Sequence, residues 1–121
     1  MIKYLKKRRA AFHFAGKGIR SLFRDESHAK IHLLAALCVI AAGIIWRVSP
    51  VEWCLLLLCI GGVFMAEGFN TAVEKLADRI TTERDPLIGA AKDIAAGAVL
   101  LFVIASVAIG LIIFIPKFLP S

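Results

Sequence analysis

The sequence is poor in the residues that would make it a disulfide-stapled, flexible or acidic protein. Among 121 residues, three are cysteine, four are proline and nine are glycine. There are nine aspartates and glutamates but fifteen lysines and arginines. So little proline and glycine excludes a collagen-like or linker-like chain. Cys38, Cys54 and Cys59 all lie in apolar segments and form no Cys-x-x-Cys pair. We interpret them as reduced packing residues.

Apolar residues dominate instead, at 60% of the chain and a mean hydropathy of +0.81. They gather in runs at 31–46, 53–66 and 94–115. Because a bilayer core needs about 20 apolar residues in a helix, only the third run suffices alone, and the others must extend into their flanks. A soluble helical bundle is the alternative, but residues 54–66, CLLLLCIGGVFMA, show no polar face at the helical period. We predict one all-α membrane domain over 1–121, with transmembrane helices at about 29–48, 52–80 and 87–115.

The placement of positive charge points to a membrane rather than to nucleic acid, although the net charge is +6. Nine of the fifteen basic residues precede residue 31, four lie between the second and third runs, and only Arg47 and Lys117 fall on the other side. By the positive-inside rule, we expect a multi-pass membrane protein with its N-terminus in the cytoplasm and its C-terminus outside.

The first 24 residues mix basic side chains with apolar and aromatic ones. This composition predicts an amphipathic surface helix at about 3–24, with cations near anionic headgroups and aromatics in the acyl boundary. We expect Gly16 and Gly18 to bend or interrupt it. Residues 25–27 then form a polar hinge before the first span.

A polar stripe follows the second apolar run, in residues 66–80, AEGFNTAVEKLADRI. At roughly 100° per residue, its polar members fall within about 80° of one helix face and descend about 16 Å; they are Glu67, Asn70, Glu74 and Asp78. Carboxylates that begin at membrane depth persist where they face protein, a cavity or a cation. Carboxylate and amide oxygens suit a hard divalent cation. Asp78 and its neighbour Arg79 could equally be the solvated end of a helix that leaves the membrane, with no part in a cation site.

Two further polar clusters lie at the same predicted depth. Asp25 and Glu26 precede the first span, and Lys92 and Asp93 open the third. Acids, a lysine and a basic surface helix at headgroup level suit magnesium, phosphates and a lipid hydroxyl. No Walker A pattern is present, because residues 15–20, AGKGIR, lack its spacing.

These residues carry a resemblance to a known family. The stripe, preceded by KGIRSLFRDESHAKIHLLAA at 17–36 and followed by TTERDPLIGAAKDIAAGAVL at 81–100, resembles the prokaryotic diacylglycerol kinases, small membrane lipid kinases that include undecaprenol kinases. The resemblance runs from about residue 12 to 117. It implies three transmembrane helices plus a surface helix, a homotrimer with shared sites, and phosphorylation of a lipid alcohol, diacylglycerol or undecaprenol, by ATP with Mg²⁺.

The resemblance also implies roles for individual residues. Glu67 would be the general base, with Asn70 orienting it or the phosphate, and Glu26 and Glu74 would hold the metal. Such an arrangement suits phosphoryl transfer, which depends on positioning and on charge neutralisation. The remaining residues would contact nucleotide, phosphates or lipid: Lys7, Phe14, Lys17, Asp78, Glu83, Arg84, Asp85, Lys92 and Asp93.

Three positions depart from parts of the family. Asp85 stands where many members carry histidine, and Phe14 where some carry tyrosine. His32 replaces an acid and resembles the undecaprenol kinase branch, which leaves the lipid open. His28 and His32 also form an i, i+4 pair that could bind zinc, but no third ligand is near in sequence.

Two other classes of function compete with a lipid kinase. A small ion channel or transporter subunit could line its path with the carboxylate stripe. The placement of all three polar clusters on one side argues against it. A non-catalytic membrane scaffold has no need to keep so many costly polar groups together.

Overall fold

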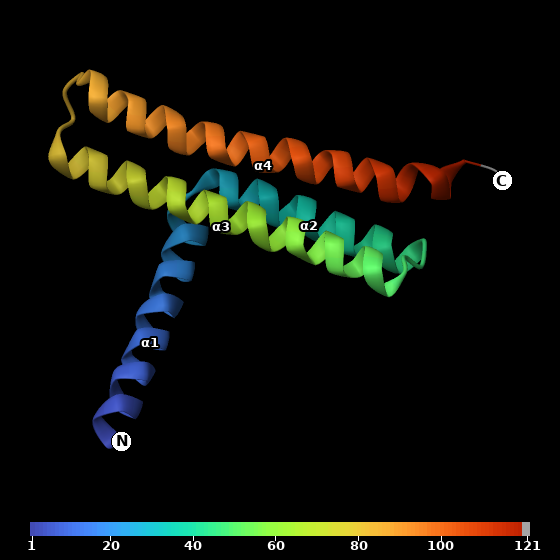
Figure 1. Cartoon of the computed structure of the whole chain (residues 1–121), viewed down its shortest axis with the longest axis horizontal. Coiled ribbons are helices and arrows are strands. Elements are labelled where there is room, and N and C mark those ends of the chain that lie inside the picture. The colour runs from blue at the N-terminus through green and yellow to red at the C-terminus, as the bar shows by residue number, and fades with distance from the viewer. Residues whose placement is uncertain (120–121) are drawn as a thin grey trace.

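The computed structural model describes residues 1–119, which form four α-helices (Figure 1). They are α1 (Ile2–Asp25), α2 (Ser27–Ile45), α3 (Pro50–Ile80) and α4 (Pro86–Phe118). Helices α2, α3 and α4 lie alongside one another, and α1 projects from them at a steep angle. The most extensive contact joins α3 to α4.

Local sequence signals set the starts of the two long helices. The Ser49 side chain accepts a hydrogen bond from the backbone N–H of Glu52, and the Glu52 carboxylate accepts one from the N–H of Ser49, which forms a capping box. Both α3 and α4 begin with proline, whose fixed φ and missing N–H suit the first helical position. Helix α4 passes through Pro116 to Phe118 rather than ending at 115. Residues 120 and 121 lie outside the described part of the chain.

Helix α1 corrects one sequence-based expectation. It runs without a break through Gly16 and Gly18, which were expected to bend it, and neither glycine has a positive φ. A glycine costs only about 1 kcal/mol inside a helix, which the flanking helix formers offset. The break comes instead at Glu26, the single non-helical residue between α1 and α2.

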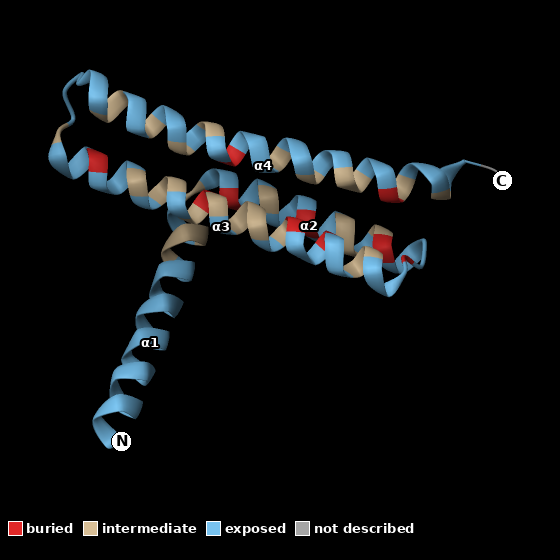
Figure 2. Ribbon diagram, in the orientation of Figure 1, coloured by how far each residue is buried: buried red, intermediate tan, exposed pale blue. Residues whose placement is uncertain are grey.

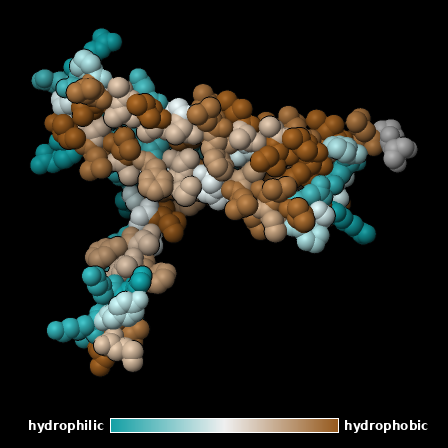
Figure 3. Space-filling view, in the orientation of Figure 1, coloured by the Kyte–Doolittle hydropathy of each residue, from teal (hydrophilic) through white to brown (hydrophobic). Residues whose placement is uncertain are grey.

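Most of the exposed surface of α2, α3 and α4 is apolar, as a lipid environment requires. All three are long and hydrophobic enough to cross a membrane, which confirms the prediction of an all-helical chain with three apolar spans. Most of their large side chains are exposed and few residues are buried (Figure 2). Apolar side chains cover the middle of the layer, while hydrophilic ones gather at its ends and along α1 (Figure 3).

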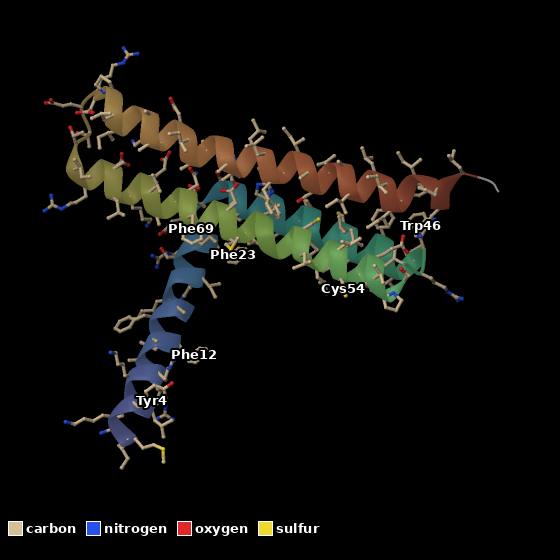
Figure 4. All side chains as sticks on the ribbon, viewed as in Figure 1. Tyr4, Phe12, Phe23, Trp46, Cys54 and Phe69 are labelled. Carbon is tan, nitrogen blue, oxygen red and sulfur yellow. The ribbon has the colours of Figure 1, made fainter. Side chains whose placement is uncertain are left out.

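At the end of the helices opposite the polar stripe, the start of α3 and the end of α4 are held together by apolar packing and by an ion pair. A small core of Val48, Leu56 and Ile113 lies there, with Trp53 against it. The ammonium group of Lys117 donates to both carboxylate oxygens of Glu52 at 3.1 Å. Trp46 packs edge-on against Phe118 (Figure 4). These contacts join the start of α3 to the end of α4.

Gly43 allows α2 to approach Trp53 closely, which generates a test of the packing. A Cβ at Gly43 would lie 2.6 Å from Cη2 of Trp53, so the indole would have to leave its place beside the core. We expect Gly43→Ala to lower the free energy of unfolding by about 1–3 kcal/mol, measured by thermal unfolding in detergent. Gly61→Ala is the control, because a Cβ there meets no atom within 4 Å. An equal loss at Gly61 would contradict this explanation.

Candidate active site

The polar face of α3 passes from buried to exposed along the helix. Glu67 is only 5% exposed and is the one buried charged residue among positions 1–119. Asn70 is half-buried, and Glu74 and Asp78 are exposed. The stripe therefore begins inside the protein and ends outside it.

Glu67 has a partner that its own stripe does not supply. Nε2 of His32, on α2, lies 3.0 Å from Oε1 of Glu67. The two residues are 35 positions apart, so no local pattern joins them. Sequence reasoning singled out His32 as a departure from part of a family and as a possible zinc ligand with His28, and missed this contact.

Asn70 lies one helical turn beyond Glu67 and presents an unpaired acceptor. Its side-chain oxygen Oδ1 is buried and has no hydrogen-bond partner within residues 1–119, and the same holds for the hydroxyl of Thr71. A buried polar atom without a partner is costly, and in native proteins it commonly marks a place for water, an ion or a ligand. The amide can therefore accept a hydrogen bond from, or coordinate, a group that enters beside Glu67.

Further along, α4 brings a cation to the stripe. Nζ of Lys92 donates to Oδ1 of Asp78 at 2.6 Å, and Glu74 is near enough to interact with the same ammonium group. Asp93 is exposed. The Lys92 ammonium group therefore lies among carboxylates at the end of the bundle where α3 and α4 are joined.

The connection between α3 and α4 holds the three acidic and basic residues expected to contact nucleotide. Glu83, Arg84 and Asp85 are all exposed. Asp85 caps α4, because its Oδ1 accepts from the N–H groups of Leu87 and Ile88 at 2.9 and 3.1 Å. Whatever else it binds, Asp85 has a structural role here.

Asp25 anchors α1 to α3. Its carboxylate accepts hydrogen bonds from Arg24 and Ser21 at 2.9 Å and from Lys75 at 3.4 Å. The hydrogen bond from Arg24, followed by that from Ser21, lowers the pKa of the Asp25 carboxyl to about 2. The group therefore stays ionised throughout the physiological pH range. Glu26, half-buried, follows at the break before α2.

The three predicted residues on α1 are not brought to Glu67 within one chain. Lys7, Phe14 and Lys17 are all exposed on α1, where the Lys17 ammonium stands 5.8 Å from the centre of the Phe14 ring. Figure 4 shows Phe23 at the junction with α3, where it contacts Phe64, while Tyr4 and Phe12 project from the free part of the helix.

The predicted metal ligands do not form a complete site on their own. No three histidine, cysteine or acidic side chains of residues 1–119 are close enough together to hold an ion. This also leaves the His28–His32 zinc alternative without support. The donor types nevertheless fit magnesium, which binds through one or two carboxylates and takes its other ligands from phosphates and water. Glu26, Glu74 and the unpaired Asn70 oxygen supply such donors.

An apolar cleft of about 200 Å³ runs between α2, α3 and α4. Its walls are aliphatic and aromatic, from residues such as Val39, Ile60, Phe64 and Val107, and its polar members are His32 and Ser106. His32 therefore belongs both to the cleft and to the contact with Glu67.

The fold and this site define a small helical membrane protein with a buried carboxylate at the head of an acidic face. The chain belongs to the prokaryotic diacylglycerol kinase family, whose pattern it matches over residues 13–114. The resemblance seen in the sequence is thereby confirmed.

Individual relatives support the same assignment. The chain is 45% identical to an undecaprenol kinase of Bacillus subtilis over 88% of this chain and 87% of the relative. It is 32% identical to a diacylglycerol kinase of Synechocystis, over 90% of this chain and 63% of the relative. A diacylglycerol kinase of Escherichia coli is 30% identical, with 78% of this chain and 77% of the relative covered.

The capping role of Asp85 is testable separately from any nucleotide contact. We expect Asp85→Ala to lower the free energy of unfolding by about 1 kcal/mol, because the N–H groups of Leu87 and Ile88 lose their acceptor. Asp85→Ser keeps a capping oxygen and should stay near the wild-type stability in the same thermal-unfolding measurement. Equal losses in both variants would show that the carboxylate, rather than the cap, is needed.

Proposed function

We propose that this protein is an ATP-dependent lipid kinase that transfers the γ-phosphoryl group to the hydroxyl of a membrane lipid alcohol, with undecaprenol as the favoured substrate. The observation that carries the proposal is the buried carboxylate of Glu67 beside the unpaired oxygen of Asn70. Membership of the family and identity to an undecaprenol kinase support it.

The depth of Glu67 suits a lipid hydroxyl. Helix α3 has 31 residues, about 46 Å at 1.5 Å per residue, which exceeds a hydrocarbon core about 30 Å thick. If the core begins near Pro50, it ends near Asn70. Glu67 then lies just within the membrane boundary, and Glu74 and Asp78 lie beyond it in the headgroup region. A lipid alcohol and a water-soluble nucleotide can meet at this level.

The reaction needs little covalent chemistry from the protein. Glu67 takes the proton of the lipid hydroxyl as that oxygen forms a bond to the γ-phosphorus, while the bond from this phosphorus to the bridging oxygen breaks and ADP leaves. Asn70 orients Glu67 or the phosphate. Lys92 offers positive charge to phosphate oxygens, for which it would exchange Asp78.

Magnesium and nucleotide contacts complete the proposed site. Glu26 and Glu74 would hold Mg²⁺, which when bound neutralises charge on the phosphate oxygens. Asp78 and Asp93 lie near the nucleotide, and Glu83, Arg84 and Asp85 near its base or ribose. Lys7, Phe14 and Lys17 lie by phosphates or lipid.

The proposed topology puts this site on the cytoplasmic side of the bacterial inner membrane. The N-terminus and the α3–α4 connection, which carry most basic residues, lie in the cytoplasm, and the C-terminus lies outside. Helix α1 rests on the membrane surface as an amphipathic helix. Its many exposed cations and aromatics suit that position.

We also propose a homotrimer with sites shared between chains. A single chain buries few residues, and Lys7, Phe14 and Lys17 of α1 are exposed. A neighbouring copy would provide both apolar cover and the missing basic groups. The channel alternative gains no support, because the buried carboxylate is paired with His32, and the cleft that His32 lines has almost entirely apolar walls rather than a polar path.

The role of Glu67 as the base predicts the effect of an isosteric change. Glu67→Gln keeps an acceptor for His32 but cannot take a proton, so we expect the kcat for phosphate transfer to fall by roughly 10²- to 10⁴-fold. A radiolabelled ATP assay measures the transfer, and cross-linking in detergent checks that the oligomer is intact. Unchanged turnover would refute the assigned base.

The preference for undecaprenol is tested by offering both lipids to the purified protein. We expect kcat/KM for undecaprenol to exceed that for diacylglycerol by roughly tenfold or more, since the two alcohols differ in both chain and headgroup contacts. The same radiolabel assay in mixed micelles measures it. Equal or reversed rates would assign the chain to the diacylglycerol branch.

A further inference from the structure

The proposed base is held by a histidine that the assigned reaction does not use. His32 lies in α2 and reaches Glu67 in α3 at 3.0 Å, with side chains that are 22% and 6% exposed. Oε2 of Glu67 has no hydrogen-bond partner in the part of the chain that the structure describes. One carboxylate oxygen is therefore occupied and the other is free.

The direction of this hydrogen bond follows from the chemistry of the two groups. An ionised carboxylate only accepts, so Nε2 of His32 must carry the proton and donate it to Oε1. The contact thus makes Nε2 of His32 the donor and engages one oxygen of Glu67.

The packing of α2 holds the imidazole in place. Ala29 and Ala36 lie on the same helical face as His32, three residues before and four after it, and are 0% and 7% exposed. Small residues at these positions let α2 approach α3 closely. His32 is therefore the long polar side chain on an otherwise small-residue face, and it has little freedom to leave Glu67.

The surroundings make the contact strong. His32 also lines the apolar cleft between the three spans. Hydrogen bonds in such low-dielectric surroundings are stronger than in water, and a buried carboxylate that loses its partner is costly. His32 thus contributes to the orientation of Glu67.

We propose that His32 is a positioning residue for the transfer: it fixes the Glu67 carboxylate so that Oε2 alone faces the lipid hydroxyl. The inference rests on Glu67 being the base. It assigns His32 no contact with lipid or nucleotide.

The test compares substitutions that keep or remove a donor at the reach of Nε2. His32→Gln places an amide N–H at similar reach, His32→Asn is one methylene shorter, and His32→Leu has no donor. His28→Leu is the matched control, because His28 lies one turn earlier on α2, is exposed and makes no hydrogen bond among residues 1–119. Each full-length variant is assayed for kcat and for the KM of undecaprenol and of ATP.

We expect His32→Leu and His32→Asn to lower kcat by about 10- to 100-fold, since a small displacement of a reacting group has that effect. Both KM values should stay within a few-fold of wild type. His32→Gln should recover most of the loss, and His28→Leu should match wild type. If the leucine variant does not fold, the glutamine and asparagine variants decide the question, because they differ by a single methylene.

Several results would overturn the inference. Wild-type kcat in His32→Leu or His32→Asn, equal losses in the glutamine and asparagine variants, or a loss confined to KM would each exclude a positioning role. Glu67→Gln, assayed alongside, separates the two hypotheses. An inactive Glu67→Gln with an unaffected His32→Leu removes only the role of His32, whereas an active Glu67→Gln removes the base and this inference with it.

Discussion

The structure depends on one costly arrangement, a carboxylate buried at membrane depth. Lipid offers Glu67 nothing to hydrogen-bond, so the protein must supply a partner from another helix. It does so by packing small residues of α2 around His32 and bringing that face against α3. The hydrogen bond between His32 and Glu67 therefore serves two purposes: it joins α2 to α3, and it positions the carboxylate of the site.

Around this contact, charge increases toward the aqueous end of the bundle. Beyond Glu67 come the half-buried Asn70 and then the exposed Glu74 and Asp78, with Lys92 facing them from α4. The gradient suits two substrates of opposite character, because an apolar alcohol fits the buried end of the stripe and a polyanion fits the exposed end. A lipid kinase must bring both substrates together, so that the hydroxyl oxygen of the lipid meets the γ-phosphorus of the nucleotide.

Much of the fold was predictable from sequence, because it follows from local rules. Hydropathy gives the three spans, and the 3.6-residue period puts the carboxylates on one face. The contacts that complete the site were not predictable in this way. His32 and Glu67 are 35 residues apart, and Lys92 and Asp78 are 14 apart across a turn, so each pairing depends on how helices pack. The predicted bend at Gly16 and Gly18 was wrong for the opposite reason. The two glycines are a local signal for a bend, but the helix-forming residues on either side outweigh it.

The capping box of Ser49 and Glu52, joined to Lys117, has a mechanical consequence. It fastens α3 to α4 at the end farthest from the acidic face. The other ends of the two helices are joined by the short connection at 81–85 and by the hydrogen bond from Lys92 to Asp78. The two helices are therefore tied at both ends, and neither end can open without the loss of one of these contacts.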